Sequence, residues 1–288
     1  MSGGVLYRGM DRAALDRAYS PSSTAHDMSG ALREWTVRSE AARALLGRPR
    51  ELRYGPAGRQ VVDFFPAGRP GRGGKGAPLL VFLHGGYWIE GSRHDSAFLA
   101  PSFVPRGVAY AAVGYPLAPA AGLDEIVASC EQAVEFLHAR ARDLGVDADR
   151  VHLCGLSAGA HLAAMVATGR TAHRVRGLTA VSGVYDLRPV ALSYVGEPLR
   201  LDAVSATRNS PLHRLRAGLP PLVTAYAEHD TGEFVRQSAE FAGAWQNAGN
   251  TGLLIEEAGT HHFDVVHRCG DPRSALGAAI LEQIGDTS

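Results

Sequence analysis

The sequence predicts an α/β fold with a mostly parallel sheet and helices on both of its faces. Short, uniformly apolar runs recur along the chain and alternate with helical or polar segments. Strands buried on both faces have this composition, because the helices that connect them cover the sheet. The pattern changes once, near residue 50, where helical spacing gives way to strands. We therefore expect a helical appendage or cap over residues 1–48 and one α/β catalytic domain over 49–288.

The elements follow from the spacing of apolar residues. Helical spacing predicts helices over residues 11–19 and 27–46. Apolar residues at 52–54 and 61–65 are separated by a turn and predict a hairpin. Residues 68–78, rich in Gly, Pro and Arg, predict a flexible surface connection. Further strands are expected at 79–83, 108–113, 150–154, 177–181, 222–226 and 252–256, with helices at about 124–144, at 160–167 and from about 233.

The composition is that of an ordinary globular protein. Hydrophobic residues make up 45% and charged residues 20% of the 288 residues, which excludes a mostly disordered chain. The 29 basic and 29 acidic residues balance, so no net field attracts nucleic acid or an anionic membrane surface. Bulk charge therefore does not select the partner of this protein.

The sequence predicts neither a targeting signal nor a disulfide framework. Residues 1–19 are charged and lack the apolar core of a secretory signal, and no stretch approaches the roughly 20 apolar residues of a membrane span. Cys130, Cys154 and Cys269 fall in apolar segments and cannot build a CxxC metal site. We expect a soluble, cytoplasmic protein with no nucleic-acid or membrane partner.

A GxSxG motif at residues 155–159 is the sharpest chemical signal. It lies between an apolar strand and a helical run, which is the context that a nucleophilic serine on a strained turn requires. Large side chains two residues either side of the serine would clash, and Gly155 and Gly159 remove them. We expect Ser157 to be the nucleophile and the Ala158 N–H to stabilise an oxyanion. The alternative is a chance match in a Gly- and Ala-rich chain.

A second glycine motif follows the strand at 79–83. Gly85 and Gly86 come directly after His84, and bare backbone there lets N–H groups point into a cleft. Their N–H groups are the expected second half of the oxyanion hole. An ordinary β-turn is the alternative, but the order of the two motifs along the chain matches that of acyl-transfer enzymes.

A serine nucleophile requires a base and an orienting carboxylate. The carboxylate should follow a strand, because the carboxyl ends of the strands converge on the cleft. Asp230 follows the strand at 222–226 and is the expected acid. Asp186 follows an earlier strand and is its rival, whereas Glu228 lies two residues from Asp230 and would point elsewhere.

The expected base lies in the pair His261-His262, which follows the last strand. Only one of two adjacent histidines can face the serine, and the spacing alone does not separate them. No HExxH motif or carboxylate cluster indicates a metal site. The remaining histidines are expected to shape the pocket or satisfy backbone groups near the cleft, as for His84, His161 and His229, or to lie on the surface, as for His26, His138, His173 and His267.

These motifs together resemble those of the α/β hydrolases. The closer resemblance is to the kynurenine formamidase (arylformamidase) family, which is related to esterases and lipases with an HGG motif. The resemblance spans residue 51 to the C-terminus, and Tyr19-Ser20-Pro21 resembles an N-terminal segment of the family. It rests on motifs in the family's order, namely His84-Gly85-Gly86-Tyr87-Trp88, Ser157-Ala158-Gly159-Ala160-His161, Gly183-Val184-Tyr185-Asp186-Leu187, Asp230 with Glu233, Phe234 and Gln237, and His262-Phe263-Asp264.

The resemblance implies an α/β-hydrolase fold with a mostly parallel eight-stranded sheet. It also favours His262 as the base, because the family's histidine directly precedes a Phe-Asp pair. Ser157 would then cleave an aryl formamide, N-formylkynurenine above all, through a formyl-enzyme that water converts to formate. No cofactor is implied. The family resemblance suggests a homodimer, and it fits a place in tryptophan breakdown or in a specialised biosynthetic route.

Two departures leave room for other substrates. Gly155-Leu156 stands where the family more often has Gly-His, and Gly114 stands where such enzymes often have Asn or Asp. Neither change touches the expected triad. The alternatives are therefore a short-chain carboxylesterase, a hydrolase of another aryl amide, or a non-catalytic ligand-binding relative, and the presence of all three triad residues disfavours the last.

Aromatic residues near the motifs predict a flat apolar pocket. Tyr87 and Trp88 replace the third glycine of an HGGG loop and would form a wall suited to a planar ring. The alternative for Trp88 is that it packs under the loop. His161, Tyr185 and Phe263 are further candidates for contact with substrate, on adjacency alone.

Overall fold

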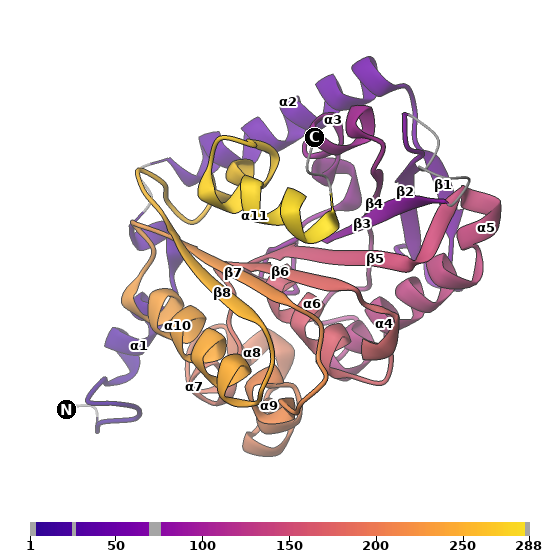
Figure 1. The fold of residues 1–288 in the computed structure, drawn as a ribbon. Coiled ribbons are helices and arrows are strands. Elements are labelled where there is room, and N and C mark those ends of the chain that lie inside the picture. Colours follow the sequence, from indigo (N-terminus) through magenta and orange to yellow (C-terminus); the bar gives the residue numbers. More distant parts are fainter. Residues whose placement is uncertain (1–3, 25–26, 69–75, 286–288) are drawn as a thin grey trace.

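The computed structural model describes residues 4–24, 27–68 and 76–285. Its centre is an eight-stranded sheet with the strand order β1-β2-β4-β3-β5-β6-β7-β8 (Figure 1). The two pairings that involve β2 are antiparallel and the others are parallel. The strands are β1 Arg50–Arg53, β2 Val61–Phe65, β3 Ala77–Leu83, β4 Ala109–Val113, β5 Val146–Leu156, β6 Gly177–Val181, β7 Leu222–Ala227 and β8 Gly252–Glu257.

Helices connect the strands and cover both faces of the sheet (Figure 1). The α-helices are α1 Arg12–Ala18, α2 Met28–Leu46, α3 Ala100–Phe103, α4 Leu123–Ala139, α5 Ala141–Leu144, α6 Ala158–Thr168, α7 Arg188–Ala191, α8 Gly196–Leu199, α9 Ala203–Arg208, α10 Gly232–Asn247 and α11 Ala275–Ile284. Short 3₁₀ helices are η1 Pro21–Ser23, η3 Arg93–Ser96, η4 Val104–Arg106, η5 Ala172–Arg174, η6 Pro211–Arg214 and η7 Val265–Gly270.

Strand β3 shows why the sheet is buried on both sides. Its successive side chains point to opposite faces, so Leu79 and Val81 belong to one hydrophobic core and Leu80 and Phe82 to the other. Helices α4, α6 and α10 contribute to the first core, and α3 and α11 to the second. A strand with two apolar faces appears in the sequence as an uninterrupted apolar run, which is the pattern that predicted it.

The predicted α/β fold and hairpin are confirmed, with differences at the ends of elements. The helix expected at 124–144 is broken at Arg140, whose φ of −98° and ψ of 3° interrupt the helical geometry between α4 and α5. Strand β5 begins at Val146, four residues before the predicted start, because its polar first half still extends the sheet: Val146 pairs with Ala77 of β3. Residues 69–75 of the predicted surface connection lie outside the described residues.

The N-terminal residues form the predicted helices α1 and α2 and also reach the core. Leu15 and Tyr19 are fully buried and belong to the core on the α10 side of the sheet. Helix α2 lies along the opposite side, beside α3 and α11 in Figure 1. The division at residue 48 stays a prediction.

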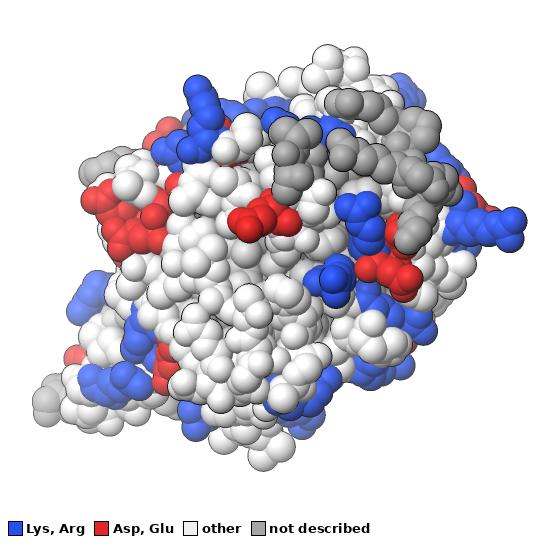
Figure 2. All heavy atoms as spheres, in the orientation of Figure 1, with Lys and Arg blue, Asp and Glu red and all other residues white. Residues whose placement is uncertain are grey.

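Charged side chains are dispersed on the face that Figure 2 shows. Basic and acidic residues occur in small separate groups around an uncharged area. Within the described ranges, no helix is long and apolar enough to cross a membrane. His267 was expected on the surface but is half-buried against the ring of Phe98, with ring centroids 5.3 Å apart, and burial lowers its pKa to about 4. His229 was expected near the cleft, but it is exposed and does not line the cavity. His26 lies outside the described residues.

Candidate active site

The GxSxG motif forms a sharp turn between β5 and α6, as predicted. Ser157 has φ 56° and ψ −121°, a conformation that costs a non-glycine residue free energy and persists only where the surroundings impose it. A Cβ at Gly155 would lie 2.2 Å from the carbonyl oxygen of Gly159, and one at Gly159 would lie 2.0 Å from that of Leu83. Both glycines are therefore required by close backbone approach.

The turn places Ser157 between the sheet and a cavity. Its N–H donates a hydrogen bond of 2.8 Å to the carbonyl oxygen of Val181, at the end of the neighbouring strand β6. Its side chain lines the cavity together with His262. Among the described residues no hydrogen bond joins these two side chains, and such bonds are often long before substrate binds.

His262 is paired with Asp230. Nδ1 of His262 lies 2.7 Å from Oδ1 of Asp230, and both side chains are almost fully buried. The other carboxylate oxygen accepts hydrogen bonds from Oγ of Ser182, at 2.6 Å, and from the N–H of Ala227, at 2.9 Å. Burial by itself would raise the pKa of Asp230, but the attraction of His262 and these hydrogen bonds outweigh it and hold the pKa below its usual value. Asp230 is therefore an ionised acceptor at neutral pH.

The alternatives for the acid and the base have other partners. Asp186 forms an ion pair of 2.7 Å with Arg188. Glu228 accepts a hydrogen bond of 2.7 Å from the N–H of Gly259. His261 turns away from Asp230, and its Nε2 lies 3.2 Å from Asp264. The geometry thus pairs His262 with Asp230, a choice that sequence spacing left open.

The predicted oxyanion donors border the serine. A Cβ at Gly85 would lie 3.0 Å from the carbonyl oxygen of Leu156 and 3.3 Å from the Cβ of Ser157, so a side chain there would crowd the serine turn. Gly86 has φ +108°, which favours glycine. Within the described residues, the N–H groups of Gly85, Gly86 and Ala158 have no hydrogen-bond acceptor. Gly85 and Gly86 line the same cavity as Ser157, and Ala158 follows this serine directly in the chain.

His84 anchors the loop that carries these glycines. Its ring stacks on Tyr115, with centroids 4.2 Å apart, and the Tyr115 hydroxyl donates to the His84 carbonyl oxygen at 2.6 Å. Burial lowers the pKa of His84 to about 4, so the ring is neutral. We therefore assign His84 to the support of the loop and not to proton transfer.

The cavity in front of Ser157 has a volume of about 440 Å³, which suits a small organic ligand. Its walls are largely aromatic and aliphatic, and its charged lining residues are the acids Glu90 and Asp95, with no Lys or Arg among the described residues. Helix α2 and the N-terminal residues form one wall. The lining residues of this wall are Pro21, Ser22, Met28, Leu32, Trp35 and Thr36.

Two of the five predicted substrate contacts line this cavity, namely Tyr87 and Phe263. The other three do not. Trp88 is fully buried under the loop and donates from Nε1 to Nδ1 of His161 at 3.2 Å, which is the alternative considered for it. Tyr185 stacks on Phe241 in the core, with ring centroids 4.1 Å apart. We therefore remove Trp88, His161 and Tyr185 from the candidate substrate contacts.

Three residues near the predicted site, Ser182, Trp35 and Tyr194, were not predicted from the sequence. Ser182 reaches Asp230 only because β6 and β7 are adjacent strands, and a serine at the end of the predicted strand 177–181 was the available signal. Trp35 and Tyr194 line the cavity from distant parts of the chain, and nothing in their spacing indicates this. In the described part of the chain, no group of three or more His, Cys, Asp or Glu side chains is placed to hold a metal ion.

The fold and the serine turn define an α/β hydrolase. The BD-FAE family model matches residues 69–186. A solved structure from Silicibacter sp. TM1040, provisionally described as a thioesterase, has 28% identity and a TM-score of 0.79 over 92% of this chain and 98% of that one. The carboxylesterase EstE1 from a metagenomic library, 20% identical with a TM-score of 0.70 over 94% and 99% of the chains, shares the fold.

Curated relatives narrow this class. Kynurenine formamidase of Salmo salar is 31% identical over 97% of this chain and 98% of its own length. Kynurenine formamidase of Danio rerio is 32% identical with the same coverage. The chain therefore belongs to the kynurenine formamidase family of α/β hydrolases.

Proposed function

We propose that this hydrolase cleaves aryl formamides, with N-formylkynurenine as the preferred substrate and kynurenine and formate as products. The observation that carries the proposal is the similarity to two kynurenine formamidases over almost the whole chain. The site supports it, because the cavity joins an apolar aromatic wall to a serine and three free N–H donors.

In the first step, Oγ of Ser157 attacks the formyl carbonyl carbon. Nε2 of His262 accepts the hydroxyl proton, because Nδ1 of the same ring donates to Asp230. The negative charge that develops on the carbonyl oxygen is stabilised by the N–H groups of Gly85, Gly86 and Ala158. The C–N bond then breaks, and the His262 imidazolium returns its proton to the departing aryl amine.

In the second step, water resolves the formyl-enzyme. His262 removes a proton from the water as it attacks the formyl carbon, and the tetrahedral intermediate collapses to formic acid, which releases a proton to solvent and becomes formate. The Ser157 oxygen recovers the proton from His262, so the free enzyme is regenerated. The side chain of His262 carries the proton in both steps, and we propose that the reaction needs no cofactor.

The walls of the cavity suit a planar substrate with a small acyl group. Tyr87 and Phe263 lie on the loops that carry the oxyanion donors and the base, and Trp35 faces them from α2. Flat aromatic side chains pack well against an aryl ring. We also propose that residues 1–48 act as a cap, since α2 supplies lining residues to this cavity.

A panel of N-formylkynurenine, formanilides, matched acetanilides and short p-nitrophenyl esters tests the proposal by release of the aromatic amine or alcohol. We expect the highest kcat/KM for N-formylkynurenine. A value no higher than that for the esters would contradict the formamidase proposal and favour a short-chain carboxylesterase, the second function, which the esterase fold relatives support.

Fluorophosphonate labelling separates a catalytic protein from a ligand-binding relative. We expect covalent labelling at Ser157, found by peptide mass spectrometry. A folded but unlabelled protein would favour the binding alternative. A cytoplasmic location and a homodimer are further proposals that rest on the sequence and on the family resemblance, and light scattering of the purified chain tests the dimer.

A further inference from the structure

The N-terminal segment makes one hydrogen bond to each of three active-site loops. Each bond falls on the residue directly after a proposed functional residue. Tyr87 follows Gly86 of the oxyanion loop. The hydroxyl of Tyr87 donates to the carbonyl oxygen of Tyr19, and the Tyr194 hydroxyl lies 3.3 Å from the same oxygen.

The contact at Tyr87 explains how the loop keeps its shape. Tyr87 has φ 45°, a region in which a bulky side chain is held only when its surroundings impose it. Burial raises the pKa of Tyr87 well above its ordinary value, so its hydroxyl stays protonated and remains a donor. The Tyr19 carbonyl therefore fixes the strained residue next to Gly86.

The second bond falls on Thr231, directly after Asp230. Thr231 occupies the position before α10 at which a threonine hydroxyl usually accepts a bond from the helix N-terminus. Here it makes no such capping bond and instead donates to the carbonyl oxygen of Ala18. The hydroxyl thus joins the acid loop to the N-terminal segment.

The third bond falls on Phe263, directly after His262. Nε1 of Trp35, on α2, donates to the Phe263 carbonyl oxygen at 2.9 Å. A separate packing contact reaches the base itself, because the ring of Phe234 lies 6.3 Å from that of Tyr19 and 4.5 Å from that of His262, between centroids.

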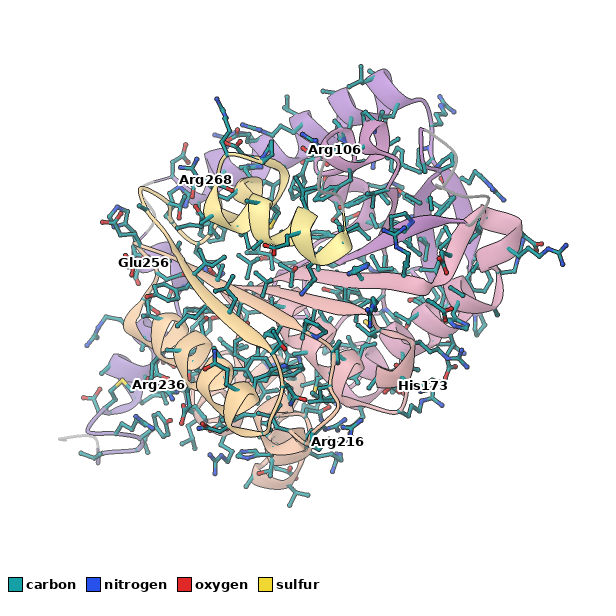
Figure 3. All side chains as sticks on the ribbon, viewed as in Figure 1. Arg106, His173, Arg216, Arg236, Glu256 and Arg268 are labelled. Carbon is teal, nitrogen blue, oxygen red and sulfur yellow. The ribbon has the colours of Figure 1, made fainter. Side chains whose placement is uncertain are left out.

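Tyr19 is itself firmly held. Its fully buried side chain donates to Oε2 of Glu233 at 2.6 Å and accepts from Nε2 of Gln237 at 2.8 Å. Glu233 also pairs with Arg236 at 2.8 Å, which Figure 3 labels on α10, on the side of the N-terminal helix α1. The N-terminal segment is therefore anchored to α10 independently of the loops.

We propose that Ala18, Tyr19 and Trp35 form a brace that sets the separation of the oxyanion loop, the acid and the base. The loops belong to different strands, and no hydrogen bond joins Ser157 to His262 in the described structure. The acid and base loops are joined directly by the bond of His262 to Asp230, so the brace acts chiefly on the position of the oxyanion loop relative to this pair. The brace is a positioning element, and the inference rests on the proposed serine chemistry but not on the choice of substrate.

Thr231→Val gives the sharpest test. Valine matches threonine in shape, the residue does not line the cavity, and no helix cap is lost. We expect the rate constant for fluorophosphonate labelling of Ser157, and kcat, to fall by about tenfold or more with KM unchanged, since small misplacements of catalytic groups cost up to about 100-fold. Thr231→Ser retains a hydroxyl and should restore most of the labelling rate.

Tyr87→Phe tests the second loop by the same labelling measurement, with the same expected loss. Tyr226→Phe is its matched control, because the Tyr226 hydroxyl donates to Glu256 at 2.8 Å. Glu256, which Figure 3 labels, lies on the edge strand β8. This control should label at the wild-type rate.

Labelling at the wild-type rate by both Thr231→Val and Tyr87→Phe would overturn the brace, whatever happens to the melting temperature. If one variant fails to fold, the other carries the test, and Thr231→Ser reports whether the hydroxyl matters. Labelling does not depend on the acyl group of a substrate. A protein that labels normally but does not turn over formamides would therefore contradict the proposed substrate and leave the brace intact.

Discussion

Ser182→Ala removes one of the three hydrogen bonds that the structure directs to Asp230. The lost bond, 2.6 Å from the Ser182 hydroxyl to Oδ2, joins two fully buried side chains. Hydrogen bonds to charged groups contribute about 1.5–3 kcal/mol. Oδ2 keeps the Ala227 N–H and Oδ1 keeps His262, so the lower end, about 1.5 kcal/mol, is the appropriate magnitude.

If the carboxylate orients His262 in the transition state, this loss lowers kcat/KM by about tenfold. The pKa of Asp230 lies below its usual value in the folded protein, so its ionisation contributes stability above the unfolded pKa that is lost as the pH falls through the folded pKa. Ser182→Ala raises the folded pKa toward the usual value. The acid limb of activity should therefore lie at a higher pH than in the wild type, and the stability lost between the unfolded and folded pKa of Asp230 should be smaller.

The assay combines kcat/KM with denaturant unfolding, both measured from neutral pH down to pH values below 3.8, the usual pKa of an aspartate. Ser193→Ala is the control, since Ser193 is equally buried but donates to the Val190 carbonyl oxygen, away from Asp230. A Ser182→Ala enzyme with the kcat/KM and acid limb of the wild type would show that this hydrogen bond does not support the carboxylate, and the reasoning would be wrong.

Further outcomes follow from the same geometry. Ser157→Ala should lower kcat by about 10³-fold or more, measured with the best substrate of the panel and with retained binding of product. Asp230→Asn should lower kcat by about 10⁴-fold because it imposes the wrong imidazole tautomer, whereas Asp186→Asn should retain turnover; the reverse result would make Asp186 the acid. Gly159→Ala should destabilise the fold by roughly 3 kcal/mol or more, since overpacking against fixed backbone has few ways to relax. Gly243→Ala, where a Cβ meets open space on α10, should instead stabilise it by up to about 1 kcal/mol, and urea unfolding measures both.

Local pattern was sufficient for the parts of the fold that local chemistry controls. The apolar run at β3 could only be a strand covered on both faces, and its residues do divide between two cores. Glycine is required at positions 155 and 159 on either side of the serine turn. A Cβ added at Gly155 or at Gly159 would lie 2.2 Å or 2.0 Å, respectively, from a backbone carbonyl oxygen. Such requirements act within a few residues, so they are visible in the sequence.

Pocket membership could not be predicted in the same way. Trp88 and His161 lie within motifs beside the oxyanion loop and the serine, yet their side chains turn inward and bond to each other. Tyr185 was assigned by adjacency and instead stacks in the core. Whether a side chain faces a cavity or the core depends on the neighbouring elements, and adjacency in sequence carries little information about them.

By itself, the sequence determined the class of protein, an α/β hydrolase, and predicted the chemistry that we propose for it, namely a serine on a strand-to-helix turn with glycine donors, an acid and a histidine in hydrolase order. Only the tertiary structure decided which histidine meets Asp230, that Ser182 supports this carboxylate, and that Ala18, Tyr19 and Trp35 contact three active-site loops. The reason is physical: covalent order sets what each turn can do, whereas contacts between residues up to 228 positions apart exist only once the sheet has brought its strand ends together.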